Sequence, residues 1–314
     1  MERFGTFTKE YIIDSFQRKQ WNTLVRKRTN KLIYNTEEVL SLQDTSKIIR
    51  GFIDSGRPFM AGRFGANELS ATKIFDFKIF FKYKKILGLL HDNAGVFPET
   101  KEMGYRFANL MIDSISQLDL IAVWNLPFER YYLNAFGNNK LQYTQLRDLE
   151  PWSNPSNPWS YSLRGKKVLV VHPFEKTIKK QFLKNKQIFV NSDILPNFEL
   201  STLKSVQSVT GESDPRFDDW FSALYWMRDE ILSREFDIAI LGCGAYGFPL
   251  AAEIKKAGKQ AIHLGGATQL LFGIMGTRWE KDEIISQYVN DNWVRPSKEE
   301  TPLLADNIEN GCYW

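Results

Sequence analysis

The sequence has only two cysteines, Cys243 and Cys312, in 314 residues. Two are too few for a disulfide framework in a chain of this size, and neither stands in the spacing of a zinc site. The longest apolar runs are far shorter than the roughly 20 residues that a membrane-spanning helix needs. The first residues, MERFGTFTKE, do not have the form of a signal peptide. We therefore expect a cytoplasmic protein, in solution or at the inner face of the membrane.

The chain also lacks a strong overall charge. Its net charge of +4 at pH 7 is too small to indicate a nucleic-acid partner, and we expect none. Basic residues are concentrated in residues 1–34, where eight lysines and arginines stand against three acids, a local charge of +5 (8 − 3). Apolar residues interleave with them at helical spacing, which is typical of weak peripheral contact with an anionic membrane. The alternative is that the polar face of this helix is exposed to solvent while its apolar stripe packs against the protein. Segment 77–87, which also combines basic and apolar residues, leaves the same two alternatives open.

What the chain does contain is typical of a globular protein, with 43% hydrophobic and 25% charged residues. Apolar segments of strand length alternate with segments of helical period, which predicts an α/β fold with a Rossmann-like, mainly parallel sheet and flanking helices. We expect an N-terminal helical segment over residues 1–55, with an extra helix at its start, and an α/β domain over residues 56–314. Region 147–163 is the candidate internal linker, although its two tryptophans indicate that it packs against the protein.

Some local elements are predicted from capping residues, prolines and short apolar runs. We expect a helix over residues 36–55, strands over 58–62, 118–124 and 187–190, and a loop over 91–98.

Residues 236–278 form the clearest unit of the sequence. A buried strand over 238–241 precedes Gly242, Gly244 and Gly247, whose spacing lets backbone N–H groups approach a phosphate. The alternative is that these glycines only permit close packing of a helix on a strand. A dinucleotide-binding fold also requires an acid after the next strand, and His263-Leu264-Gly265 supplies none, which disfavours a nicotinamide enzyme. For Cys243, a small residue in a tight turn is a better interpretation than a nucleophile.

A second strand-to-helix junction follows the early strand, with Arg63, Gly65 and Glu68 in its turn. Arg63 presents a planar fork that suits a phosphate or a carboxylate, and its alternative role is a salt bridge to Glu68. Because ligand groups collect at the carboxyl ends of parallel strands, we expect the site to include Arg63 to Glu68, Asn93, Asn125, His172, Gly242 to Gly247, and His263 to Gln269.

Four motifs together resemble the bacterial GT-D-fold glycosyltransferases and related proteins of exopolysaccharide and surface-glycan clusters. They are the turn Gly62-Arg63-Phe64-Gly65-Ala66-Asn67-Glu68, HPFEKTIKKQ from His172, LGGATQLLFGIMGTRW from Leu264, and the final ENGCYW. The resemblance covers residues 55–314. It implies transfer of a sugar from a nucleotide-diphosphate donor to a glycan or lipid-linked glycan acceptor, in surface polysaccharide or glycoprotein glycan assembly.

The positions at the strand ends and the resemblance together give roles for single residues. Glu68 and Arg63 are the expected catalytic residues, and donor contacts are expected from Asn67, Asn93, His172, Gly242, Gly244, Gly247, His263, Gly265 and Gln269. The family has a D-x-E motif at the turn, and here Ala66 replaces its first acid. Either Glu68 still binds Mg²⁺ or Mn²⁺ or acts as a general base, or the metal is absent and Arg63, lysines and backbone N–H groups neutralise the diphosphate.

Two other classes of function stay open at this point. An incomplete D-x-E motif is also compatible with a non-catalytic subunit that binds a nucleotide or a glycan. An NAD- or S-adenosylmethionine-dependent enzyme of Rossmann type is the third alternative. The sequence does not specify the sugar, the acceptor or the stereochemistry of transfer.

Overall fold

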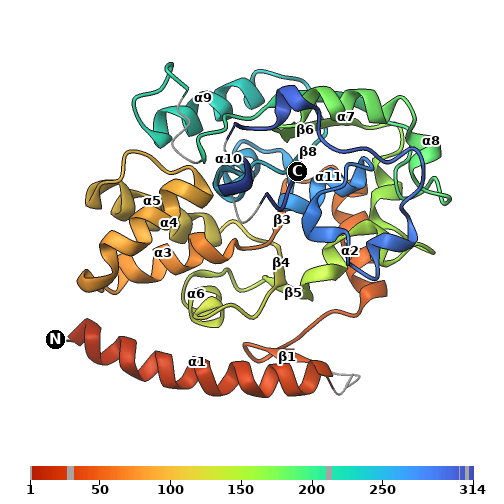
Figure 1. The fold of residues 1–314 in the computed structure, drawn as a ribbon. Coiled ribbons are helices and arrows are strands. Elements are labelled where there is room, and N and C mark those ends of the chain that lie inside the picture. The colour runs from red at the N-terminus through yellow and green to blue at the C-terminus, as the bar shows by residue number, and fades with distance from the viewer. Residues whose placement is uncertain (1, 27–31, 210–213, 304, 308–310) are drawn as a thin grey trace.

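The computed structural model describes residues 2–26, 32–209, 214–303, 305–307 and 311–314. It is built around a sheet of seven strands in the order β5-β4-β3-β9-β8-β6-β7 (Figure 1). Every neighbouring pair in this sheet is parallel, which confirms the predicted Rossmann-like α/β class. The strands are β3 (Phe59–Gly62), β4 (Leu120–Val123), β5 (Gln142–Gln145), β6 (Lys167–His172), β7 (Glu199–Lys204), β8 (Ile238–Leu241) and β9 (Gln260–His263).

Helices pack on both sides of the sheet. The core on one side includes residues of α3 (Ala66–Asp76), α4 (Tyr83–Ala94), α5 (Lys101–Ile115), α6 (Glu129–Phe136), α9 (Trp220–Leu232) and α10 (Gly247–Lys256). The core on the other side includes residues of α2 (Leu42–Ser55), α7 (Glu175–Phe182), α8 (Asn185–Ile188) and α11 (Thr268–Leu271).

The central strands are apolar on both faces because each face is covered. In β6, Leu169 and Val171 belong to one core, while Val168 and Val170 belong to the other. Successive side chains of a strand point to opposite faces, so a strand that is buried on both sides has a continuous apolar run. This is why the central strands could be recognised in the sequence.

The path of the chain brings β3 and β9 together. From β3 the chain runs outward through β4 to the edge strand β5, and it then crosses to the other half of the sheet at β6. It returns through β8 to β9, which pairs with β3 so that Phe59 lies opposite Gln260. The turns after β3 and β9 are therefore neighbours, at the point where the strand order reverses. Such a point is the usual ligand site of an open parallel sheet.

The crossing between the two halves is made by the predicted linker region, which is folded against the protein. It contains three short 3-10 helices, η2 (Leu146–Leu149), η3 (Pro151–Ser153) and η4 (Trp159–Leu163). Trp152 and Trp159 are fully buried in it, and the Trp159 indole N–H donates to the Leu149 carbonyl at 2.9 Å. The region is therefore a packed crossover and not a free tether.

The N-terminal segment differs in part from its prediction. Helix α1 (Glu2–Arg26) lies along one side of the molecule, next to α6 (Figure 1). The predicted helix start at Thr36 is wrong, because β1 (Ile33–Tyr34) and β2 (Glu37–Glu38) form a hairpin there. Helix α2 begins after Ser41, whose hydroxyl accepts from the Asp44 N–H, and it ends as predicted before Gly56.

Two other local predictions need correction, and two strands had no prediction. Residues 187–190 do not form a strand, since α8 covers Gln187 and Ile188 and the next two residues are in neither a helix nor a strand. His91 to Ala94 form the last turn of α4 and not a loop, and the chain leaves the helix only at Gly95. The edge strands β5 and β7 had no prediction, because an edge strand is less buried and its sequence is correspondingly polar.

Candidate functional site

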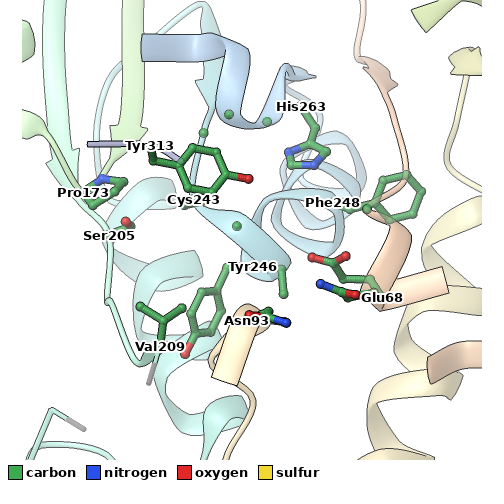
Figure 2. A pocket seen from close by; sticks show the side chains of 18 of the residues that line it. Glu68, Asn93, Pro173, Ser205, Val209, Cys243, Tyr246, Phe248, His263 and Tyr313 are labelled. Carbon is green, nitrogen blue, oxygen red and sulfur yellow. The ribbon is translucent and has the colours of Figure 1, made fainter. Parts of the chain in front are cut away.

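One pocket lies at the carboxyl-terminal edge of the sheet, with a cavity of about 180 Å³ (Figure 2). Its lining includes residues at the carboxyl ends of six of the seven strands, all except β5. Of the eleven residues with a predicted catalytic or donor-binding role, ten line this pocket, and Gly247 lies outside the lining. Ligand pockets usually measure about 300–1,000 Å³, so a ligand the size of a nucleotide-sugar would extend beyond this cavity.

The turn between β3 and α3 places a carboxylate at a helix N-terminus. Gly65 is the N-cap of α3, and Glu68 lies in the first turn. A Cβ atom on Gly65 would lie 1.9 Å from Glu68 Oε2, which means that the carboxylate folds back over this glycine. The partial positive charge of the helix N-terminus favours a carboxylate in this position. Ala66 and Asn67, in the same turn, also line the pocket.

Arg63 supplies a positive charge to the pocket. Its guanidinium carbon lies 4.8 Å from the centroid of the Trp124 ring, a cation–π contact that holds the planar group in place. This stacking orients the guanidinium, and Glu68 is close enough for its charge to raise the pKa of Arg63. Burial lowers the pKa of Arg63, and nearby Tyr313 and Glu150 oppose this shift. An arginine nevertheless stays protonated at neutral pH.

A second arginine borders the same cavity. Arg278 Nη1 donates to the Tyr313 hydroxyl at 3.1 Å, and the guanidinium lies 4.8 Å from the centroid of the Tyr313 ring. Its charge is close enough to contribute to the lowered pKa of Arg63. Arg278, Tyr313 and Trp124 had no predicted role, although two of them lie in the motifs GTRW and ENGCYW. The pocket therefore concentrates positive charge that local patterns did not reveal.

His172 is the last residue of β6 and is buried beside the cavity. The Phe174 N–H donates to His172 Nδ1 at 2.9 Å, so Nε2 carries the proton of the neutral ring. Burial lowers the pKa of His172 to about 3, and the ring is therefore neutral at physiological pH. His172 can donate one hydrogen bond from Nε2, but it is not a proton acceptor for catalysis at pH 7.

His263, at the end of β9, is also neutral. Burial, assisted by the charge of Arg63, lowers its pKa to about 3. Its Nδ1 atom is buried and has no hydrogen-bond partner within the part of the chain that the structure describes. Figure 2 shows His263, Glu68 and Tyr313 around the same space, although they come from β9, α3 and the final segment.

The glycines of the loop after β8 have different functions in the fold. A Cβ on Gly242 would lie 2.6 Å from His172 Cδ2, and a Cβ on Gly247 would lie 2.3 Å from His263 Nδ1. Both glycines thus make room for a histidine ring, as the packing alternative predicts. Gly244 has a φ of +56° and open space around it, so it is the glycine of this loop whose backbone a ligand can approach.

Cys243, between these glycines, is a buried thiol. Burial raises its pKa to about 12, so the sulfur stays protonated and is a poor nucleophile at neutral pH.

Two amide side chains of the pocket, Asn93 and Gln269, have different surroundings. Asn93 lines it from the last turn of α4. Gln269 is fully buried and donates from Nε2 to the Tyr313 carbonyl at 3.0 Å and to the Ile274 carbonyl at 3.2 Å, so it holds the final segment in place.

Asn125, which was expected at this edge of the sheet, does not line the pocket. Its side-chain amide instead donates to Asn22 Oδ1 of α1 at 3.0 Å.

The side chains of the pocket do not resemble a metal centre. Among the described residues, no group of three or more histidine, cysteine, aspartate or glutamate side chains is placed to hold an ion. Within the lining Glu68 is the single carboxylate, while hard cations such as Mg²⁺ take several oxygen ligands. The residues present therefore do not fit a metal site built by the protein alone.

No family model matches the sequence, and none of the curated proteins matches it. Two solved structures are similar, one of which is described as "the highly conserved domain of unknown function 1792" with "a distinct glycosyltransferase fold". The other is a selenomethionine-substituted structure of the same domain. Both are 16% identical over 83% of this chain and 92% of theirs, with TM-scores of 0.43 and 0.42. Because these values are low, the pocket alone supports the function proposed below.

Proposed function

We propose that this chain is a glycosyltransferase that moves a sugar from a nucleotide-diphosphate donor to a glycan acceptor of surface polysaccharide or glycoprotein glycan assembly. The observation that carries the proposal is the combination of two arginines with a single carboxylate in one pocket at the switch point of the sheet. A diphosphate leaving group requires fixed positive charge, and an acceptor hydroxyl requires a base.

The positive side of the pocket suits the diphosphate. Arg63 and Arg278 offer planar guanidinium groups, which bind phosphate oxygens with two parallel hydrogen bonds. His172 Nε2–H is a neutral donor, and Gly244 leaves its backbone accessible. These groups stabilise negative charge as the bond between the anomeric carbon and the diphosphate oxygen breaks.

Glu68 is the base in this proposal. It takes the proton of the acceptor hydroxyl while that oxygen forms a bond to the anomeric carbon, and the electron pair of the broken bond goes to the diphosphate. The neutral histidines are less suitable bases, because His172 Nδ1 already accepts from the Phe174 N–H and burial lowers the pKa of both rings to about 3.

The test compares the wild-type chain with Glu68→Gln. Calorimetric titration with UDP-, GDP- and dTDP-sugars, with and without Mn²⁺, identifies the donor, and single-turnover assays measure transfer. We expect the variant to bind the donor but to transfer about 10²–10⁴-fold more slowly. Equal transfer by Glu68→Gln would exclude the catalytic role of Glu68. Binding without any transfer by the wild type would favour the non-catalytic subunit, and binding of NAD or S-adenosylmethionine alone would favour the third class.

A further inference from the structure

Helix α1 has one side that packs against the protein. The Phe7 ring is stacked on Phe128 with centroids 5.3 Å apart, and Asp14 Oδ1 accepts from the Phe128 N–H at 3.0 Å. Trp21 packs edge-on against Tyr34. Since Phe7, Asp14 and Trp21 are seven residues apart, they form one stripe along the helix.

The opposite side of α1 is apolar and exposed. Ile12 and Phe16 are 64% and 70% exposed. At 3.6 residues per turn each lies about 160° around the helix from Asp14, so they are neighbours on the face of α1 that points away from the protein. Lys9 and Lys19 lie on either side of this face and are exposed as well. A solvated helix face is normally polar, so packing within the chain does not account for these two residues.

A second exposed apolar pair lies in the turn between α3 and α4. Phe80 and Phe81 are 67% and 79% exposed. The surrounding segment, KIFFKYKK over residues 78–85, has four lysines and no acid. These lysines are all exposed, which repeats the pattern of apolar side chains within a ring of positive charge.

The two exposed pairs belong to elements that contact each other. Phe7 of α1 contacts Phe77, at the beginning of the α3–α4 turn, with ring centroids 5.3 Å apart. Lys73 is within electrostatic reach of both Lys82 in that turn and Arg18 in α1. In Figure 1 the N-terminal half of α1 runs beside this turn. We call this surface the basal face; it consists of Lys9, Ile12, Phe16, Lys19, Phe80, Phe81, Lys82, Lys84 and Lys85.

We propose that the basal face docks on the surface of an anionic phospholipid bilayer. Isoleucine and phenylalanine side chains enter the boundary between headgroups and acyl chains, while lysines reach the phosphates. No helix of the described residues is long and apolar enough to span a membrane, so the contact is peripheral. A second copy of the chain would oppose lysines to lysines, and the charge therefore favours an acidic lipid surface over a symmetric dimer.

The experiment uses the full chain and sedimentation with vesicles of phosphatidylcholine, with or without phosphatidylglycerol. We expect binding to the vesicles that contain phosphatidylglycerol, and weaker binding at high salt. Ile12→Ser with Phe16→Ser should reduce the affinity about tenfold or more, because two apolar insertions are lost. Lys82→Gln with Lys84→Gln and Lys85→Gln should reduce it by on the order of tenfold to a hundredfold at low salt.

The matched control is Leu183→Ser with Val190→Ser, which removes two apolar side chains that are 87% and 103% exposed in the region of α7 and α8. This control should bind vesicles like the wild type. Equal binding to neutral vesicles, or unchanged binding of both basal-face variants, would overturn the proposal. A dimer in sedimentation velocity that Ile12→Ser with Phe16→Ser dissociates would assign the face to a second copy instead.

Discussion

At the scale of the residue, Arg63 is the side chain whose shape matters as much as its charge. Arg63→Lys keeps the positive charge but loses both the planar fork and the stacking on Trp124. We expect the affinity for the donor to fall about tenfold, as measured by calorimetry, because charge-assisted hydrogen bonds are lost. Arg50→Lys is the control, since Arg50 lies at the same 4.8 Å from the Tyr161 ring but outside the pocket. Equal losses in both variants would contradict a specific role of Arg63.

Gly65 gives a second prediction at this scale, because it makes room for the Glu68 carboxylate. Its φ of −89° suits alanine, so Gly65→Ala adds no backbone strain, but the new methyl group would collide with Glu68. We expect transfer to fall toward the level of Glu68→Gln while the melting temperature changes by only a few degrees, about 1 kcal/mol or less. Gly51→Ala, in the open part of α2, should leave transfer unchanged. Full activity of Gly65→Ala would show that the position of Glu68 is unimportant.

At the scale of the element, the crossover between β5 and β6 depends on its buried tryptophans. Trp159→Phe removes an indole N–H that donates to the Leu149 carbonyl. Trp220→Phe removes the same atoms at an equally buried position, but that indole N–H has no hydrogen-bond partner among the described residues. We therefore expect Trp159→Phe to lower the unfolding free energy by about 1–3 kcal/mol more than Trp220→Phe in denaturant titrations. Similar losses would mean that the hydrogen bond does not stabilise the crossover.

The elements also show why some predictions succeeded and others failed. Strand β8 lies at its predicted residues, because it is buried on both faces and followed by glycines. Strands β5 and β7 were missed, because their sequences at the sheet edges are polar. The hairpin at residues 33–38 stands where the sequence predicts a helix start, because Thr36 and the following acids also match helix capping.

At the scale of the whole molecule, stability should depend on pH through the buried histidines. His172 has a pKa of about 3 in the folded chain, below the 6.5 of an exposed histidine. Its stabilising contribution is thus fully present above pH 6.5 and is lost as the pH falls toward 3, because the unfolded chain then binds the proton more readily. Buried Glu129, whose pKa burial raises to about 7, acts in the opposite direction.

The difference in unfolding free energy between the wild type and His172→Asn separates the contribution of His172 from that of Glu129. The asparagine oxygen can still accept from the Phe174 N–H, but it does not titrate. Between pH 6 and 4 we expect the unfolding free energy of the wild type to fall more steeply, by about 1.4 kcal/mol per pH unit. Parallel curves of unfolding free energy against pH would contradict a strongly lowered pKa of His172.

The whole fold also relates the pocket to the basal face. Trp124 lines the pocket, and the next residue, Asn125, accepts from Arg18 Nε of α1 at 2.9 Å through its carbonyl. The helix proposed to touch the bilayer is therefore anchored directly beside the rim of the proposed active site. Such an arrangement suits an acceptor that is itself linked to a lipid.

The sequence by itself determined the α/β class and the turns in which ligand groups would stand, because burial on both faces and glycine spacing are local patterns. Only the tertiary structure decided which of these turns share a pocket, since β3 and β9 are about 200 residues apart and pair through the strand order. The tertiary structure places Arg278 and Tyr313 in the same pocket as Arg63. It places Asn125 in a contact with α1 instead of in the pocket. It also decided which side of α1 is covered, because its apolar residues lie all round the helix and only the elements packed against it, among them α6 and β1, distinguish the packed side.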